Sequence, residues 1–279
     1  MEAIYSVMDA LLPFEAFRFS FMKNAFLAVL LLTPLLGLLG TMAVNHQMAF
    51  FSDALGHSAI TGIGLGMVLG MHNDLLAMLI FGVVWAILSC LIKESGSASV
   101  DTIISVFSST SIAAGLLILA RGGKFAKYSS LLIGDILAVT PADLTALAVA
   151  LPLGVLLWAV MYNQLLLTSV SPSLARSRGI HIRVVECAFV VLVAFAVMLA
   201  IRWVGMLLIN ALLILPAAAG RNLASNSRQH AVFTVLIALF SGVLGLIAAY
   251  YGDTSAGAAI VLIAALFYAL SLLARRFRK

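Results

Sequence analysis

Phe51-Ser-Asp-Ala-Leu-Gly-His-Ser-Ala-Ile-Thr-Gly-Ile-Gly-Leu-Gly66 is an apolar, glycine-rich stretch that begins with an aspartate and a histidine four residues apart. Residues four apart on an α-helix are neighbours on one face, so the spacing predicts a helix that presents Asp53 and His57 side by side. Long apolar segments precede and follow this stretch. Because ionisable side chains are costly inside a membrane and commonly mark functional sites there, the pair is the first candidate for a function.

The composition excludes a soluble globular fold. The chain has 279 residues, of which 63% are hydrophobic and 10% charged, and its mean hydropathy is +1.16. A soluble domain carries about 25% charged residues. The apolar runs are continuous, which favours membrane-spanning helices over the alternating strands of a membrane barrel. We therefore predict an all-α, polytopic integral membrane protein in which residues 1–279 form a single transmembrane domain embedded in lipid.

The basic character of the chain comes from its loops. The net charge is +5 and the pI about 9.5, but the Lys and Arg residues lie between apolar segments. This distribution is typical of membrane proteins and does not indicate a nucleic-acid partner. The chain has no phosphate-binding motif of the form GxxxxGK[ST]. We therefore expect it not to be an enzyme, and any ATP chemistry to come from another chain.

Two smaller features concern oxidation and processing. The two cysteines, Cys90 and Cys187, lie at the edges of apolar runs, and we expect neither a structural disulfide nor a cysteine metal site. The first residues include Glu2, Asp9 and Glu15 and have no basic cluster. We therefore expect no cleaved signal peptide, and the first spanning helix to serve as the insertion signal.

Nine apolar segments are predicted to span the membrane. Residues 1–20 mix apolar and charged side chains and are predicted to lie at the interface, whereas residues 129–137 are apolar but too short to span. The longest polar connection is 162–183. The predicted spans are about 21–44, 54–71, 75–92, 101–120, 142–161, 184–201, 204–219, 231–250 and 257–273.

The basic residues predict the orientation of these spans. Nine spans place the termini on opposite sides, and a cytoplasmic C-terminus puts more basic residues inside than outside, as membrane proteins prefer. The inner set would be Lys93, Arg176, Arg178, Arg183, Arg221, Arg228, Arg275, Arg276, Arg278 and Lys279. The outer set would be Arg18, Lys23, Arg121, Lys124, Lys127 and Arg202. We predict an outer N-terminus and a cytoplasmic C-terminus.

Asp53 and His57 are candidate metal ligands. A carboxylate and a neutral imidazole suit Zn²⁺ well and Mn²⁺ acceptably, and iron(II) is a third candidate. Two ligands are too few for a site, but a two-fold dimer would bring together two aspartates and two histidines. The alternative is that Asp53 caps the helix after Ser52 and that His57 is a packed core residue. The spacing alone leaves both interpretations open.

The same helix carries a row of small residues. Ala54, Ser58, Gly62, Gly66 and Gly70 recur at every fourth position, so another helix can approach this face closely. The row lies one residue, about 100°, round the helix from the Asp53 and His57 face. This arrangement is compatible with a pore-lining helix, although general membrane-helix packing explains the glycines equally well.

Two loop features are weaker candidates. Ser171-Pro-Ser-Leu-Ala-Arg-Ser-Arg178 can form a short helix with Ser171 or Ser173 as N-cap. Such a helix can dock in a groove of a soluble partner, but the segment is also compatible with a solvated linker. Asp253, in the turn before the last span, could attract cations, or simply be a turn residue.

Taken together, these motifs resemble the membrane permease subunits of zinc/manganese ABC importers, the ABC-3 family. The resemblance covers nearly the whole chain. Besides Phe51–Ala59 it rests on Asp101-Thr-Ile-Ile-Ser-Val-Phe107, Ile133-Gly-Asp-Ile-Leu-Ala-Val-Thr-Pro-Ala-Asp143, Ser171-Pro-Ser-Leu-Ala175 with Gly179-Ile180, Val204-Gly-Met-Leu-Leu-Ile-Asn-Ala-Leu-Leu-Ile-Leu-Pro-Ala-Ala-Ala-Gly-Arg221, and Asp253-Thr-Ser-Ala-Gly257.

The resemblance implies an architecture and a set of partners. It implies a type II importer permease fold, like that of the vitamin B12 importer, and a homodimer in the bacterial cytoplasmic membrane. It also implies two cytoplasmic ATPase subunits and an extracytoplasmic metal-binding protein. Asp53 and His57 would form the metal site. The residues that would couple to the ATPase are Ser171, Pro172, Ser173, Leu174, Ala175, Arg176, Gly179 and Ile180.

The predicted function is therefore ATP-driven import of a divalent transition-metal ion, with no permanently bound cofactor. One alternative is an ion-coupled secondary transporter that works alone, although we find no internal repeat of the kind common in that class. Another is a membrane protein with a structural or assembly role and no transported substrate. The predicted cargo is zinc or manganese, with iron(II) as a further candidate; the sequence does not choose among them, because a carboxylate and an imidazole serve all three.

Overall fold

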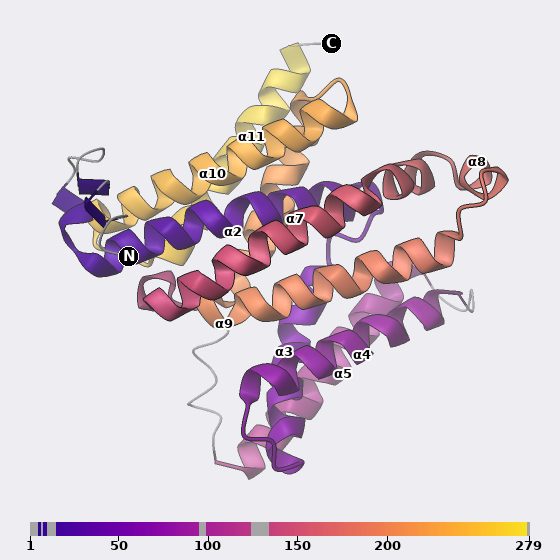
Figure 1. Cartoon of the computed structure of the whole chain (residues 1–279), viewed down its shortest axis with the longest axis horizontal. Helices are drawn as coiled ribbons and strands as arrows, with labels where there is room; N and C mark the ends of the chain where they lie inside the picture. Colours follow the sequence, from indigo (N-terminus) through magenta and orange to yellow (C-terminus); the bar gives the residue numbers. More distant parts are fainter. Residues whose placement is uncertain (1–4, 7, 10–14, 95–98, 124–133, 278–279) are drawn as a thin grey trace. The chain divides into compact units, whose positions relative to one another are not determined.

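The computed structural model describes residues 5–6, 8–9, 15–94, 99–123 and 134–277, and every element within these ranges is a helix (Figure 1). Long apolar segments form helices because a helix satisfies its own backbone hydrogen bonds in lipid. The helices are η1 (Glu15–Arg18), α2 (Ser20–Asn45), α3 (Phe51–Val68), α4 (Asp74–Glu94), α5 (Val100–Arg121), η2 (Ile136–Ala138), α7 (Pro141–Val170), α8 (Pro172–Ser177), α9 (Ile182–Leu223), α10 (Ser227–Gly252) and α11 (Ala256–Phe277).

The chain divides into two compact units. The first consists of Met1–Thr41, Ile133–Val155 and Trp203–Lys279, and the second of Met42–Leu132 and Leu156–Arg202. Three helices, α2, α7 and α9, contribute residues to both units. The second unit contains the motif helix α3 and the short helix α8, so the candidate functional residues other than Asp253 belong to it.

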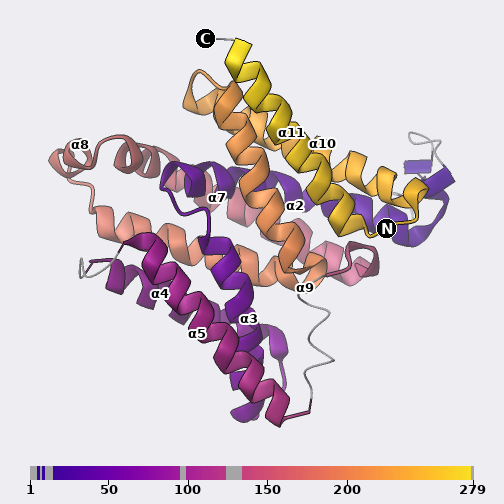
Figure 2. The ribbon, with the colours of Figure 1, turned by 180° about the vertical axis from the view of Figure 1, so that it is seen from behind.

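In the second unit, α3 is the buried helix, and α4 and α5 pack against it (Figures 1 and 2). A side chain at Gly62 would meet Met78 and Phe81 of α4, and one at Gly66 would overlap Ala77. On the α5 side, Gly115 lies against the backbone of Thr61. The absence of side chains at these positions lets the helix backbones approach closely.

The remaining members of the small-residue row differ in their surroundings. Ser58 is fully buried and donates a hydrogen bond to the carbonyl of Leu55 (2.7 Å). Gly70 lies beyond the end of α3, with a φ of +71° and no atom within 4 Å of the place a side chain would occupy. Gly70 therefore takes part in the turn after the helix and not in the packing contact with α4.

The first unit is built around the α10–α11 pair, which lies side by side in both views of the ribbon (Figures 1 and 2). Gly245 of α10 faces the backbone of Ile260 in α11. On another side of α10, Gly242 lies against Val29 of α2. Glycines again set the closest helix contacts, because lipid provides no hydrophobic drive to bring helices together and close packing must do so.

The largest differences from the predicted boundaries concern α7 and α9. α7 continues to Val170, nine residues beyond the predicted end at 161, so the connection to α9 begins at Ser171 and is shorter than 162–183. The reason is that the residues from 162 to 170 are mostly apolar and continue the helix. The predicted spans 184–201 and 204–219 join in the 42-residue helix α9, which is interrupted at Gly205 by non-helical dihedral angles (φ 77°, ψ 166°).

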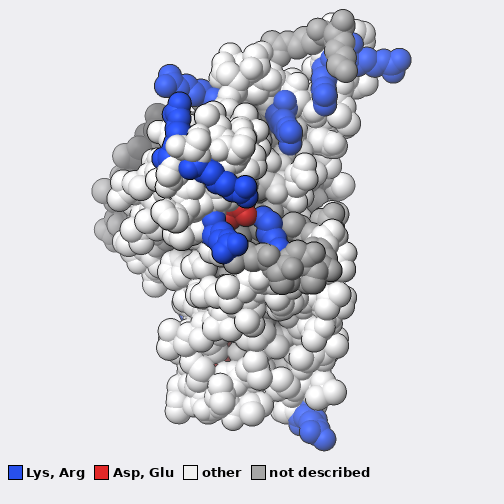
Figure 3. All heavy atoms as spheres, turned by 90° about the vertical axis from the view of Figure 1, so that its right-hand side faces the viewer, with Lys and Arg blue, Asp and Glu red and all other residues white. Residues whose placement is uncertain are grey.

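Seven of the described helices are long and apolar enough to cross a membrane: α2, α4, α5, α7, α9, α10 and α11. α9 contains two of the nine predicted spans. α3 corresponds to another, although its polar residues and glycines make it less apolar. Uncharged side chains cover most of the face drawn in Figure 3. Exposed apolar residues such as Val149, Leu156 and Leu262 are expected where helices face lipid.

Two predicted segments lie partly outside the described residues. Of the predicted interfacial segment 1–20, Glu15–Arg18 forms η1, and Lys23 of α2 makes an ion pair with Asp9 (2.6 Å). Of the short apolar piece 129–137, residues 129–133 are outside the described residues. Ile136 begins η2, and the Asp135 side chain caps it by accepting a hydrogen bond from the Leu137 amide.

Candidate metal centre

The start of α3 places Asp53 and His57. The helix begins at Phe51, and Phe50 is its N-cap residue, without a side-chain capping bond. Asp53 is therefore the third residue of the helix and not its cap. A carboxylate in the first turn also interacts favourably with the helix dipole. The helical repeat then brings His57, one turn later, onto the same face as Asp53.

The two side chains meet on the open face of a buried helix. His57 Nε2 lies 3.6 Å from Asp53 Oδ2, and the exposed fractions of the two side chains are 25% and 47%, respectively. Their neighbours Ala54, Leu55 and Ser58 are buried. The imidazole and the carboxylate are consequently accessible while the helix that carries them is held by packing. A cation can approach both groups without a rearrangement of α3.

Asp53 and His57 alone are too few ligands for a metal site. Among the described residues, no group of three or more His, Cys, Asp or Glu side chains could hold a metal ion. A protein zinc site usually has four ligands, or three and an open position. The described part of one chain supplies two, so a complete site needs further ligands.

A buried hydrogen-bond network holds the helix that carries the pair. Thr61, one turn after His57, donates a hydrogen bond to the carbonyl of Ser111 in α5. Trp85 of α4 donates through Nε1 to the Ser111 hydroxyl (3.2 Å). Three helices are thus joined at Ser111. These residues were not predicted as part of the site, because Thr61 and Ser111 are 50 positions apart and no local pattern connects them.

The short helix α8 follows the end of α7. The Ser171 hydroxyl accepts a hydrogen bond from the Leu174 amide (3.3 Å), which makes Ser171 the N-cap, and Pro172 is the first helical residue. Gly179 has a φ of +74°, and the Ile180 amide donates to the carbonyl of Ala175 (3.0 Å). A capped start and a glycine-containing end define a short helix in an otherwise exposed connection.

The outer surface of α8 is exposed. Ala175 is fully buried and anchors the helix in its unit. Ser173, Leu174 and Arg176 are exposed, and Leu174 exposes 45% of its surface. The helix therefore presents an apolar side chain and a cation together.

Asp253 belongs to the other compact unit and has the geometry of a turn residue. It is the C-cap of α10 with a φ of 48°, in the left-handed region, and its amide donates to the carbonyl of Ala249. Aspartate tolerates this conformation better than most residues. Its position is fully explained by the turn between α10 and α11.

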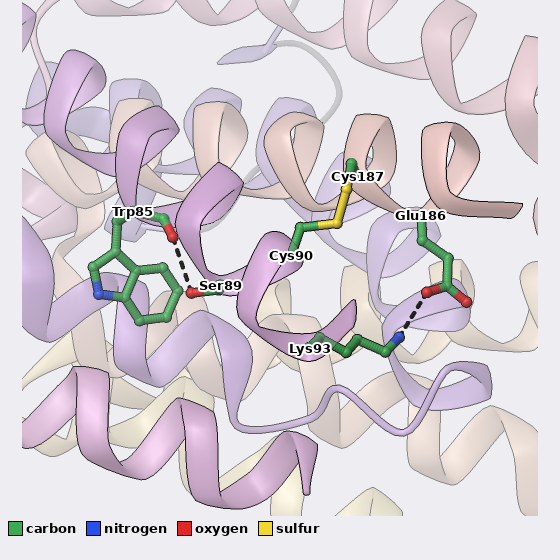
Figure 4. Close-up of a disulfide and its surroundings, with 6 residues drawn as sticks. All are labelled: Trp85, Ser89, Cys90, Lys93, Glu186 and Cys187. Atoms are coloured by element: carbon green, nitrogen blue, oxygen red, sulfur yellow. Dashed lines mark hydrogen bonds and ion pairs between the residues drawn. A yellow bond between two sulfur atoms is a disulfide. The ribbon is translucent and has the colours of Figure 1, made fainter. Parts of the chain in front are cut away.

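Contrary to the sequence-based expectation, Cys90 and Cys187 form a disulfide. It joins α4 to α9, with a Cα–Cα distance of 5.8 Å (Figure 4). The expectation was wrong because the cysteines are 97 positions apart, and only the folded helices bring them together. Beside the disulfide, Lys93 Nζ forms an ion pair with Glu186 Oε2 (2.6 Å).

His46, which follows α2, also belongs to this cluster. Its Nδ1 lies 3.9 Å from Glu186 Oε1, and its Nε2 is 3.1 Å from the carbonyl oxygen of Leu165 in α7. Burial lowers the pKa of His46 below its ordinary value, and the Glu186 carboxylate opposes this shift. The ends of four helices, α2, α4, α7 and α9, therefore meet through polar contacts around Glu186.

The described elements are all helical, and seven of them are long and apolar enough to cross a membrane, as in a multi-pass membrane protein. The profile of the ABC 3 transport family matches residues 18–275, and the chain belongs to this family. This confirms the resemblance seen in the motifs, and with it that the chain is a permease subunit and not an enzyme, with ATP hydrolysis in a separate partner.

Curated relatives and a solved structure agree with this assignment. The high-affinity zinc uptake system membrane protein ZnuB of Haemophilus influenzae is 29% identical over 92% of this chain and 98% of its own. The manganese import system permease protein ScaB of Streptococcus parasanguinis is 28% identical over 91% of this chain and 90% of its own. The structure of PsaBC from Streptococcus pneumoniae in complex with Fab is 27% identical, with a TM-score of 0.80 over 97% of this chain and 95% of that one.

Proposed function

We propose that this permease imports a divalent transition-metal ion, zinc or manganese, along a pathway lined by Asp53 and His57. The observation that carries the proposal is the position of the pair. Two ligand side chains, 3.6 Å apart, are accessible on a helix that is otherwise buried. A carboxylate beside a neutral imidazole is a ligand set that both metals accept.

We propose that a homodimer completes the site. One chain supplies two ligands, and a two-fold axis close to α3 would supply two more of the same kinds. Two aspartates and two histidines satisfy the four-coordinate preference of zinc, and added water would suit manganese. The ion is cargo that passes through this site, and no cofactor is bound permanently.

The cargo proposal draws on the relatives as well as on the ligands. ZnuB is named for zinc uptake and ScaB for manganese import. The Asp53 and His57 pair is compatible with both ions, and iron(II) is a third candidate by the same chemistry. An extracytoplasmic binding protein would deliver the ion to the outer side of the permease.

We propose that α8 receives the movement of the partner ATPase. Leu174 and Arg176 are exposed on a short helix that is anchored through Ala175, which suits a rigid contact with a groove on a soluble protein. When ATP brings the two ATPase subunits together, α8 moves with them. The helices behind α8 then change the side from which the ion is accessible.

We propose a bacterial cytoplasmic-membrane location with the N-terminus outside and the C-terminus in the cytoplasm. The excess of basic residues in the loops assigned to the cytoplasm supports this orientation. It places α8 on the ATP-containing side. Membrane-impermeant labelling of tags placed at Glu2 and Lys279 tests it. A tag at Glu2 should be labelled in intact cells and one at Lys279 only after lysis, and the reverse pattern would reject the orientation.

Reconstitution tests the transport function. The permease, its co-purified ATPase and the binding protein are placed in lipid vesicles, and Zn²⁺ or Mn²⁺ uptake is measured with ATP, with a non-hydrolysable analogue and without nucleotide. Uptake is expected with ATP, and not with the non-hydrolysable analogue or without nucleotide. If instead the permease accumulated metal without any ATPase, driven by an ion gradient, the chain would be a secondary transporter. Equal elemental content in cells with and without the gene, under single-metal starvation, would favour a structural role.

A further inference from the structure

The transport proposal gives no role to the disulfide between α4 and α9. Cys90 and Cys187 are the two cysteines of the chain, and their Cα–Cα distance of 5.8 Å is ordinary for a disulfide. Figure 4 shows the bond between the two helices, with the side chains of Lys93 and Glu186 pointing toward one another beside it. Two helices of one unit are therefore joined covalently and by an ion pair.

The disulfide lies within a longer contact between α4 and α9. At one level, the side chain of Met198 covers Gly82. A Cβ atom added at Gly82 would lie 2.7 Å from the Met198 side chain. Further along are the disulfide and then the ion pair of Lys93 with Glu186. The packed methionine and the ion pair can both adjust if the helices shift. A covalent bond cannot, so the disulfide decides whether α4 can slide along α9.

This contact lies between the coupling helix and the metal-binding helix. α9 begins at Ile182, soon after α8 ends at Ser177, so Cys187 is in the second turn of the helix that α8 leads into. α4 packs against α3 through Met78 and Phe81, which cover Gly62. α9 and α4 therefore connect α8 to α3 in a continuous series of elements.

A small cavity connects the disulfide with the start of α3. Its volume is about 20 Å³, room for about one water molecule. Cys90, Lys93 and Glu186 line it from α4 and α9, and Phe51 lines it from the first turn of α3. Phe51 is two residues before Asp53. The space next to Cys90 gives the contact between α4 and α9 room to adjust. Because Phe51 lines the same space, an adjustment there changes the surroundings of a residue two positions before the proposed ligand Asp53.

The proposed orientation places this disulfide at the cytoplasmic end of its helices. Thiols are normally kept reduced in the cytoplasm, so a disulfide there is more often reversible than structural. Cys90 is buried, but Cys187 is partly exposed and gives a small reductant or oxidant access to the bond. The charged residues Lys93 and Glu186 beside the disulfide are partly exposed, which fits a position near the aqueous side.

We propose that Cys90 and Cys187 form a redox-modification site that controls transport: the disulfide locks α4 to α9 and slows import, and the dithiol form releases it. The proposal rests on the proposed function in taking α8 as the coupling element and Asp53 with His57 as the metal site. Low-molecular-weight disulfides would therefore inhibit transport by oxidising the two cysteines. Dithiols would activate it by reducing them.

The chemistry is a two-electron thiol–disulfide exchange. A dithiol reductant transfers two electrons and two protons to the two sulfur atoms, the bond between Cys90 and Cys187 breaks, and the reductant closes into its own disulfide. In the opposite direction, glutathione disulfide accepts the two electrons and leaves as two glutathione thiols. A mixed disulfide with one cysteine is the intermediate in each direction.

The experiment compares the two redox forms of the same complex. Permease, partner ATPase and binding protein in vesicles are treated with dithiothreitol or with glutathione disulfide, the reagent is removed, and a thiol-reactive mass label confirms two free thiols in the permease or none. ATP-driven Zn²⁺ uptake is expected to be about fivefold or more faster in the reduced form, within the usual range of coupling between sites. The control, a Cys90→Ser/Cys187→Ser variant, should take up Zn²⁺ at the reduced rate after either treatment.

A second readout separates this proposal from the transport function. Amide hydrogen exchange of α3 and of the first turns of α9 is measured in both redox forms, and slower exchange is expected in the oxidised one. Equal uptake and equal exchange in the two forms, or a cysteine pair that glutathione disulfide cannot oxidise, would overturn the redox site. If neither redox form took up metal but amide exchange still differed between them, the transport proposal would be rejected. The disulfide would then still be supported as a lock between α4 and α9.

Discussion

Replacing Asp53 or His57 by alanine is expected to reduce ATP-driven metal uptake to background. Each change removes two of four ligands in a homodimer, one from each copy, and the remaining two hold a divalent ion weakly. The measurement is Zn²⁺ and Mn²⁺ uptake by reconstituted vesicles, with metal-limited growth as the cellular readout. The amount of permease in the membrane and its association with the ATPase should not change, because both side chains are partly exposed and their removal leaves the packing of α3 intact.

Matched controls distinguish ligand loss from a general effect of charge. His72 is an exposed histidine in the turn before α4, and Asp253 is an exposed aspartate in the turn after α10. Alanine at either position should leave uptake within about twofold of the wild type, in line with surface substitutions that change little free energy. Normal uptake by both the Asp53→Ala and the His57→Ala variants would reject the proposed metal site.

Mixed dimers extend this test to the symmetry of the site. Two differently tagged copies, one wild-type and one with the Asp53→Ala/His57→Ala double substitution, are expressed together, and the mixed dimer is isolated by sequential purification. If both copies contribute ligands to one ion, the mixed dimer should bind zinc far more weakly than the wild-type dimer. A mixed dimer that retains half of the wild-type capacity at unchanged affinity would show that each chain binds its own ion.

Leu174→Asp in α8 is expected to disconnect the permease from its ATPase. Leu174 is an exposed apolar residue on the short helix, and a carboxylate in its place would have to be desolvated in the docking groove. Loss of a central contact of this kind costs about 2 kcal/mol or more, a reduction of about 30-fold in affinity. The measurement is co-purification of the ATPase together with ATP-driven uptake, and both should be lost.

The control for this variant lies on the same helix. Ser177 donates a hydrogen bond to the carbonyl of Leu174 (2.9 Å) and is exposed. Ser177→Ala removes only that local bond and should leave ATPase binding nearly unchanged. The helix itself is held by the Ser171 cap and the buried Ala175, neither of which is altered. Full ATPase binding by Leu174→Asp would exclude this face of α8 as the docking surface.

The sequence was sufficient wherever the determining interactions are local. The spacing of Asp53 and His57 defines one helix face, because the helical repeat brings residues four apart together. Ser171 followed by Pro172 is a local capping signal, and the structure has the helix start there. The long apolar segments determine a helical membrane protein, because in lipid a continuous apolar segment satisfies its backbone hydrogen bonds within itself only as a helix. These features follow from neighbours within a few residues along the chain.

The tertiary structure decided what depends on distant partners. The disulfide joins residues 97 positions apart, and Thr61 reaches Ser111 from 50 positions away, so neither contact leaves a local pattern. The end of α7 at Val170 was also not predicted, because Asn163 and Gln164 interrupt its apolar run. The break at Gly205, in contrast, lies close to the predicted separation of spans 184–201 and 204–219. Sequence periodicity reports which face of a helix is apolar or small. Only the packing of α4 between α3 and α9 shows which helix each face meets, and with it how the proposed coupling helix is connected to the proposed metal ligands.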